Sequence, residues 1–160
     1  MLGRSFTGVS LTRSLSADSP VPHPFPVPCL GYVIRESATK WDLEGKDEEA
    51  QAAALERLRK LVLLGDTNNP DAIIPLVNSS AGHVALAVHE ATDCYIPTHV
   101  DPQQQTGKNR STESVHAISL QRGHSTPHMA GRFANQIGAR RLVLNHLGGR
   151  YGFLKATLVW

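Results

Sequence analysis

The chain has 160 residues and 41% hydrophobic content, which is enough for one domain with a buried core. Its formal net charge of +2 is small, so charge alone argues neither for nor against a nucleic-acid partner. No stretch approaches the roughly 18 consecutive apolar residues that a membrane span needs, so no membrane partner is expected. Cys29 and Cys94 lack C-x-x-C spacing, which favours two unlinked thiols in a reducing compartment.

Residues 1–28 are expected to lie outside the folded domain, which we place at 29–160. Residues 1–17 contain two arginines, four serines, two threonines and no acidic residue, a composition typical of a mitochondrial transit peptide. A disordered start is the alternative, in which case the protein is expected in the cytoplasm or nucleus. Residues 18–28 carry five prolines and predict an extended connector.

A strand and a charged helix are predicted next. Residues 29–35 have the pattern of a strand. Residues 42–60 have that of a helix, with Asp47, Glu48 and Glu49 in its first turn and basic residues at its end. The basic end could form a functional patch, although a solvent-facing charged helix explains the same pattern more simply.

From residue 61 the pattern alternates between strands and helices, which predicts an α/β fold. An apolar run ends at Asp66, Asn69 can cap a helix that starts at Pro70, and a second strand covers residues 84–90. Residues 97–114 have almost no apolar side chains and are expected to form an exposed, mobile loop, as the lids of functional sites often do.

The last unit reads as loop, helix and strand. Ser125 or Thr126 can serve as the N-cap of a helix that begins at Pro127 and ends at Gly138. The run at 142–144 is continuously apolar, which indicates a strand buried on both faces.

Carboxylate and imidazole side chains follow the predicted strands. Asp66, His89 with Glu90, and His146 stand at the carboxyl ends of three strands, and His124 stands at the entrance of the last helix. In layered α/β folds these ends meet at one edge of the sheet, where ligands bind. Such donors suit a divalent metal ion, with zinc the first expectation. Taken singly, Asp66 could start a turn, His89 could be a core histidine and Glu90 a surface acid.

Four short motifs follow one another along this part of the chain. They are GDT at 65–67, HEAT at 89–92, GHST at 123–126 and LNHLGGRY at 144–151. In order and spacing they resemble the successive motifs of ribonuclease Z, the tRNA 3′-processing endonuclease of the metallo-β-lactamase fold. CLGYVIRE at 29–36 is similar to the strand that precedes them in that family.

The resemblance implies an αββα sandwich, of which this chain would be the second half, built of strand-helix-strand units packed on a sheet. It implies an endonuclease that uses two zinc ions to cut precursor tRNA after the discriminator nucleotide and leaves a 3′-hydroxyl. By position, Asp66 would bridge both zinc ions and His146 would bind one of them. His124 would contact the scissile phosphate and assist proton transfer, held by Glu90. The residues that would support this site or shape its substrate edge are Thr67, His89, Ser125, Thr126, Arg150 and Tyr151.

The sequence departs from that family at the other metal ligands. The family has an H-x-H-x-D-H cluster, and none of the eight histidines here lies in one. The family also has a metal-binding histidine six residues before the glycine of a GY pair, where this chain has Phe25, with His23 as a candidate substitute. Each zinc ion normally takes three or more protein ligands, so Asp66 and His146 alone do not make a two-zinc site.

Three functions follow as hypotheses. The first is a ribonuclease Z-like hydrolase module that is incomplete or inactive as this chain alone, whether as a fragment or after loss of catalysis. The second is a non-catalytic half-domain that holds RNA or pairs with a partner chain, including a second copy in a homodimer. The third is another phosphodiesterase or an arylsulfatase-like hydrolase of the same fold. Half of a sandwich would also leave one apolar sheet face exposed, which favours association.

Overall fold

The structure, a computed structural model, describes residues 6–14 and 29–152. The strands form one five-stranded sheet in the order β1-β2-β3-β4-β5. They are β1 (Phe6–Ser14), β2 (Cys29–Glu36), β3 (Arg59–Leu64), β4 (His83–Glu90) and β5 (Leu142–Asn145). The α-helices are α1 (Lys40–Leu43), α2 (Glu48–Glu56), α3 (Ile74–Asn78), α4 (Thr112–Gln121) and α5 (Pro127–Gln136). Two short 3₁₀ helices are η1 (Asp71–Ile73) and η2 (Gly149–Tyr151).

The sheet is mixed. β2 pairs antiparallel with both β1 and β3, whereas β3, β4 and β5 run parallel to one another. Parallel neighbours need a crossover connection, and here η1 and α3 connect β3 to β4, while α4 and α5 connect β4 to β5. The alternation of strands and helices predicted from residue 61 is therefore confirmed.

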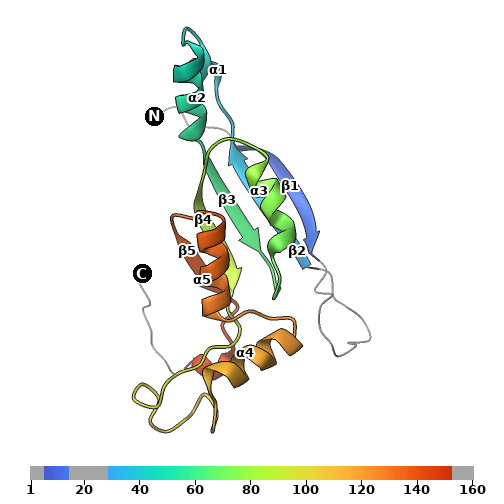
Figure 1. Cartoon of the computed structure of the whole chain (residues 1–160), viewed down its shortest axis with the longest axis vertical. Coiled ribbons are helices and arrows are strands. Elements are labelled where there is room, and N and C mark those ends of the chain that lie inside the picture. The colour runs from blue at the N-terminus through green and yellow to red at the C-terminus, as the bar shows by residue number, and fades with distance from the viewer. Residues whose placement is uncertain (1–5, 15–28, 153–160) are drawn as a thin grey trace.

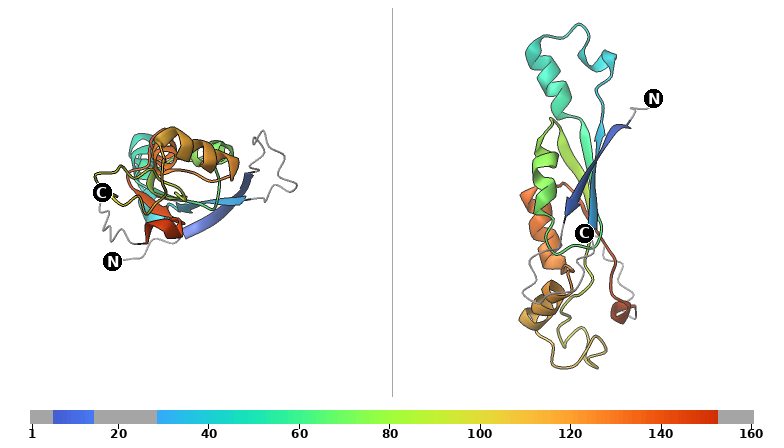
Figure 2. Two further views of the ribbon diagram at one scale, coloured as in Figure 1. Left: turned by 90° about the horizontal axis from the view of Figure 1, so that it is seen from below. Right: turned by 90° about the vertical axis from the view of Figure 1, so that its right-hand side faces the viewer.

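Two of the helices, α3 and α5, lie on the same side of the sheet. In Figure 2 (right), α3 and α5 cover one face, and Figure 1 shows α1 and α2 at one end of the elongated molecule with α4 at the other. The described residues thus form one helical layer on one sheet, a mixed α/β arrangement compatible with half of the αββα sandwich that the sequence predicted.

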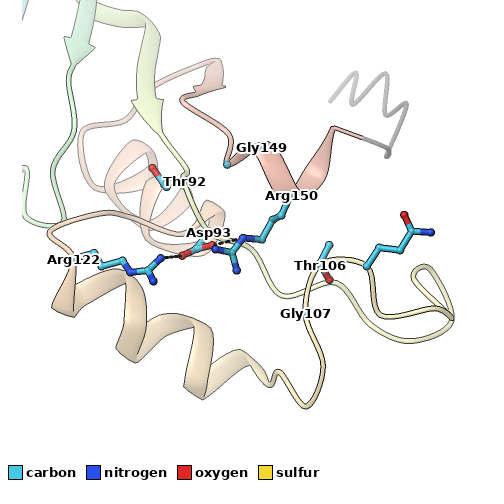
Figure 3. Close-up of a pocket in the computed structure, with 9 residues that line it drawn as sticks. Thr92, Asp93, Thr106, Gly107, Arg122, Gly149 and Arg150 are labelled. Carbon is cyan, nitrogen blue, oxygen red and sulfur yellow. Dashed lines mark ion pairs between the residues drawn. The ribbon is translucent and has the colours of Figure 1, made fainter.

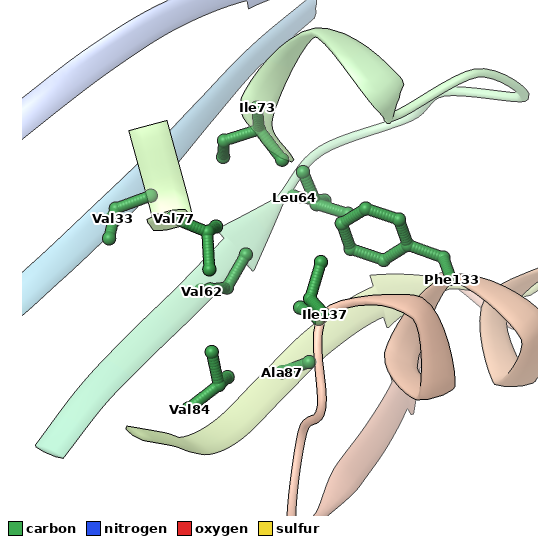
Figure 4. Packing of buried hydrophobic residues seen from close by; sticks show 9 residues of the cluster. All are labelled: Val33, Val62, Leu64, Ile73, Val77, Val84, Ala87, Phe133 and Ile137. Carbon is green, nitrogen blue, oxygen red and sulfur yellow. The ribbon is translucent and has the colours of Figure 1, made fainter. Parts of the chain in front are cut away.

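The hydrophobic core fills the space between the sheet and these helices (Figure 4). Val33, Val62 and Ala87 lie side by side on three adjacent strands and are completely buried. Phe133 and Ile137, one turn apart on α5 and at its end, pack onto this row. The other members of the cluster are Leu64, Ile73, Val77 and Val84.

The prediction of a charged helix over 42–60 was wrong at the C-terminal end of that helix. Asp47 caps α2 by accepting a hydrogen bond from the Ala50 N–H at 2.8 Å, and acidic residues fill the first turn as predicted. The helix stops at Glu56, however, and Arg59 and Lys60 open β3. Lys60 is buried, and its Nζ donates to the carbonyls of Val77 (2.8 Å) and Ser80 (2.6 Å) at the end of α3. Burial lowers the pKa of Lys60.

Most of the polar segment 97–114 is exposed, as predicted, but Asp101 and Thr106 are buried and its end is helical. Asp101 is buried and accepts hydrogen bonds from the N–H groups of Gln105 and Thr106, both at 2.9 Å. α4 begins inside the predicted loop, where Ser111 caps it by accepting from the Ser114 N–H at 3.2 Å. The mobility of this segment stays a prediction.

The strand predicted at 142–144 is present as β5, but its burial on both faces was wrong. The Val143 side chain is 47% exposed, because β5 is an edge strand and only its other face meets the helices. Leu142, on that other face, packs against the core cluster.

Part of the segment placed outside the domain belongs to the sheet. Residues 6–14 form β1, which pairs with β2 from Phe6↔Glu36 to Ser14↔Cys29. The alternation of apolar and polar residues along 9–12 is the two-residue period of a strand. The predicted connector at 18–28 lies wholly outside the described residues, and targeting to the mitochondrion stays a prediction.

Two further expectations concern the whole chain. Cys29 and Cys94 are both free thiols, as predicted. Among the helices in the described ranges, none is long and apolar enough to cross a membrane.

Candidate metal and acid–base site

The three parallel strands deliver polar side chains to one edge of the sheet. Asp66 lies two residues after β3, Glu90 ends β4, and His146 follows β5 directly. His124 lies three residues before α5. Because parallel strands end at the same edge, the residues that the sequence singled out come together.

Glu90 is the buried centre of this edge, with no exposed surface. Its Oε1 accepts from the N–H groups of Ser125 (2.7 Å) and Thr67 (3.2 Å), and its Oε2 from the N–H (2.9 Å) and hydroxyl (2.8 Å) of Thr92. His124 Nδ1 lies 3.2 Å from Oε1. One carboxylate therefore joins the loop after β3, the end of β4 and the loop before α5.

The Thr92 hydroxyl lies between two imidazole rings. Its Oγ1 is 3.2 Å from His124 Nδ1 and 3.0 Å from His146 Nδ1, and the ring centroids are 5.3 Å apart. Because the single hydroxyl proton is donated to Glu90, the oxygen accepts from both rings. Each ring then carries hydrogen on Nδ1 and keeps its lone pair on Nε2, the form that binds a metal or takes up a proton.

Asp66 and His146 form the exposed side of the cluster. His146 Nδ1 lies 3.1 Å from Asp66 Oδ1, with side chains 48% and 54% exposed, so solvent weakens this pair. His146 has a φ of 52°, in the left-handed region, which costs a non-glycine residue on the order of 1 kcal/mol. Strained backbone conformations of this kind are typical of functional sites.

Asp66, His124 and His146 fit a single metal ion. Each offers one ligand atom, and these atoms all lie within 4.8 Å of one another. Two imidazoles and one carboxylate are a donor set that zinc accepts, with a further position left for water or substrate. Within 6–14 and 29–152 no second group of three such side chains meets, so these residues do not provide the ligands of a two-zinc site.

The start of α5 positions His124. Thr126 caps the helix by accepting from the Met129 N–H at 3.3 Å, and Pro127 occupies the first turn, which confirms the predicted start. The neighbouring Ser125 hydroxyl donates instead to the Thr67 carbonyl at 2.7 Å. The loop before α5 is thereby fastened to the loop after β3.

His89 lies in the core rather than among the exposed ligands. Its ring meets Phe133 edge-on at 5.6 Å between centroids, and its Nδ1 lies 2.8 Å from the Glu90 carbonyl. Burial lowers the pKa of His89, and this outweighs the opposing hydrogen bond and the charge of Glu90. The surroundings are those of a core histidine, the simpler of the two interpretations.

Arg150 and Tyr151 lie on a different side of Thr92, around Asp93. Arg150 Nε is 3.5 Å from Asp93 Oδ1. The buried Tyr151 hydroxyl donates to the Cys94 carbonyl at 2.7 Å and accepts from the Cys94 N–H at 2.6 Å. Tyr151 thus anchors η2 to the loop after β4.

The sequence did not single out Thr92, Asp93, Arg110 or Arg122 as site residues. Thr92 stands within HEAT and Arg122 stands directly before GHST, so proximity to a motif is the signal that could have found these two. Asp93 stands directly after HEAT and shares this signal. Arg110 carries none, since its approach to Asp93 depends on the path of the loop between them.

Together these features define a mixed α/β protein with a candidate metal and acid–base site at the carboxyl edge of its sheet. No protein-family model and no curated protein matches the chain. Among solved structures, the chain is similar to human tRNase Z, short form (ELAC1), with 26% sequence identity and a TM-score of 0.42. The match covers 79% of this chain and 34% of that one, so the chain spans about a third of its length.

Proposed function

We propose that this chain is a ribonuclease Z-like module of the metallo-β-lactamase fold, for metal-dependent removal of 3′ trailers from precursor tRNA. The observation that carries the proposal is the Glu90–His124 pair beside Asp66 and His146, contributed by motifs whose order resembles that family. The proposal also holds that the module is incomplete, because residues 6–14 and 29–152 do not provide a two-zinc site.

Each side chain has a role that its surroundings support. Glu90 accepts the Nδ1 hydrogen of His124, which orients the ring so that Nε2 can exchange a proton with the reacting phosphate. Asp66 and His146 are exposed and would hold the metal ion. A zinc ion there would supply charge stabilisation at the phosphate and a water of lowered pKa.

The test adds the H-x-H-x-D-H cluster that the sequence lacks. The full chain is assayed alone and mixed with the N-terminal half of a ribonuclease Z that carries the H-x-H-x-D-H cluster, with a trailer-bearing precursor tRNA as substrate. We expect at most one zinc ion per chain by elemental analysis, no cleavage by the chain alone, and cleavage by the mixture that leaves a 3′-hydroxyl.

Substitutions then test the assigned roles. His124→Ala and Glu90→Ala should each lower cleavage by the mixture at least about 100-fold, the usual scale of acid–base catalysis, while RNA binding is largely kept. Glu90→Gln covers the case in which Glu90→Ala disturbs folding. His128→Ala, an exposed histidine on α5, is the matched control. Cleavage that survives both substitutions would contradict the roles, and loss of zinc in His124→Ala would make His124 a ligand.

The second candidate is a non-catalytic half-domain that holds RNA or pairs with a partner chain. The absence of an H-x-H-x-D-H cluster from the sequence favours it. Under this function the chain binds the precursor tRNA or the added half, yet the mixture shows neither zinc uptake nor cleavage.

A further inference from the structure

A second group of charges lies beside the site, and of its members only Arg150 was expected to shape the substrate edge. Arg110, Arg122 and Arg150 converge on Asp93, whose side chain is 3% exposed. Arg110 Nη2 is 3.4 Å from Asp93 Oδ1, Arg150 Nε is 3.5 Å from the same oxygen, and Arg122 Nη1 is 3.9 Å from Oδ2. Three positive charges meet one negative charge, which leaves these four side chains with a net charge of +2.

The three arginines are held differently. Arg110 is 11% exposed and is fixed further by Nη1, which donates to the Thr106 carbonyl at 2.8 Å and to the Tyr151 hydroxyl at 3.2 Å. Arg122 and Arg150 are 57% and 39% exposed, and each reaches Asp93 with a single nitrogen. Since a guanidinium carries five N–H donors, both keep donors for a further partner.

These two arginines border a cavity of about 420 Å³ (Figure 3). Arg122 enters from the end of α4 and Arg150 from η2, and the loop residues Thr106 and Gly107 form another wall. At Gly149 a side chain would meet no atom within 4 Å, so the backbone leaves open space there. The cavity is therefore positively charged at its rim and larger than one phosphate group.

Thr92 connects this cavity to the histidines. It lines the cavity, and its Oγ1 lies within 3.2 Å of His124 Nδ1 and 3.0 Å of His146 Nδ1. The cavity therefore lies on the Nδ1 side of both rings, and Thr92 is the residue that it shares with the site.

We propose that this cavity is a phosphate subsite, and that it takes the backbone phosphate of the RNA next to the phosphate at His124. The inference rests on the proposed function for the identity of the RNA. The planar guanidinium fork matches phosphate oxygens in charge and geometry. Asp93 holds Arg122 and Arg150 in place before the phosphate arrives, and the surplus positive charge provides the attraction.

The experiment measures binding rather than cleavage. A short fluorescein-labelled single-stranded RNA is titrated with the full chain at several salt concentrations, and inorganic phosphate is titrated separately by calorimetry. Arg122→Ala and Arg150→Ala should each weaken RNA binding about 10-fold, the scale of one charge-assisted contact, and lower the salt slope by about 0.7 per lost phosphate contact. Thermal unfolding followed by circular dichroism checks that both variants fold.

Two further variants separate the effect of the guanidinium group and of its position from the effect of charge alone. Arg150→Lys keeps the charge but loses the forked donor, so the salt slope should stay while affinity falls. Arg57→Ala removes the same charge from an exposed residue at the end of α2, at the far end of the molecule from α4 in Figure 1, and should change neither quantity. RNA binding and salt slope that stay at the unsubstituted values in both alanine variants would overturn the proposal. So would substitutions that abolish inorganic phosphate binding alone, because the site would then serve a free anion.

The subsite and the proposed function fail in different ways. If the mixture cleaves precursor tRNA equally well with and without Arg122 and Arg150, the function stands and the subsite is refuted. If RNA binding depends on both arginines while the mixture never cleaves, the subsite stands and the function is refuted.

Discussion

Adjacent residues on β4 have opposite surroundings. His89 lies against Phe133 of α5, whereas Glu90 meets the loops that carry Thr67 and Ser125. Consecutive side chains of a strand point to opposite faces, so one of the pair joins the core and the other the site. The same HEAT motif thus contributes a structural residue and a residue with candidate chemistry.

The buried His89 makes stability depend on pH. Burial holds the pKa of His89 below its ordinary value of about 6.5, even though Glu90 opposes this shift. As pH falls below about 6.5 the unfolded chain binds the proton first, so the free energy of unfolding should fall until the folded pKa is reached. His89→Leu should remove this part of the pH dependence. The free energy of unfolding is measured by urea denaturation of both chains at pH values from roughly 7.5 to 5.5.

The exposed His128 is the control for this prediction. His128→Leu should leave the pH dependence of unfolding unchanged, because His128 is exposed on α5 and takes no part in the core. If the free energy of unfolding changes equally with pH in the unsubstituted chain and in His89→Leu, then His89 does not cause the pH dependence.

At the scale of elements, α5 has a defined cap at each end. It begins at the Thr126 cap and ends in a Schellman motif, in which the Gly138 N–H donates to the Asn135 carbonyl at 3.1 Å and the Ala139 N–H to the Ala134 carbonyl at 2.9 Å. Gly138 has a φ of 62°, which this ending requires. Both ends were predicted, because capping chemistry is local and is written in adjacent residues.

Substituting alanine for the glycine inside α5 and for the glycine that follows its end should change the stability of the protein in opposite directions. Gly131 lies inside the helix, where an added Cβ would meet no atom within 4 Å, so Gly131→Ala should stabilise the protein by about 0.5–1 kcal/mol. Gly138→Ala places a side chain on a left-handed residue and should destabilise it by about 1 kcal/mol. Chemical denaturation at neutral pH measures both. A shift of the same sign in the two variants would contradict this account.

Other elements could not be predicted because long-range contacts decide them. The helical pattern of 42–60 continues through Arg59 and Lys60, yet pairing with β2 and the burial of Lys60 against the end of α3 draw both residues into β3. The polar composition of residues 112–114 placed them in the predicted loop, although they form the first turn of α4 after its Ser111 cap. Asp66, Glu90, His124 and His146 were found because each follows or precedes a predictable element, whereas the arginines around Asp93 meet only through loop paths.

At the scale of the whole molecule, the face of the sheet opposite the helices is apolar. Val33, Val62 and Ala87 point to the core, so their strand neighbours Tyr32, Leu63 and Val88 lie on the opposite face. Tyr32, Leu63 and Val88 are paired neighbours on adjacent strands, and Val88 pairs in turn with Val143 on β5, which extends this row. A parallel row runs through Ile34, Leu61 and Leu86, and Leu30 extends the face along β2.

This face should make the isolated chain associate with a second copy of itself. Leu30 and Val143 are 45% and 47% exposed, and contiguous apolar surface of this kind is uncommon on monomers. We expect the mass in sedimentation experiments to rise above 17.4 kDa with concentration, and Leu30→Lys with Val143→Lys to return it to that value. Both side chains are half exposed, so the folded chain should tolerate lysine there. Leu120→Lys on α4, at a leucine 38% exposed, is the control. A constant mass of 17.4 kDa, or equal disruption by Leu120→Lys, would show that association does not use this face.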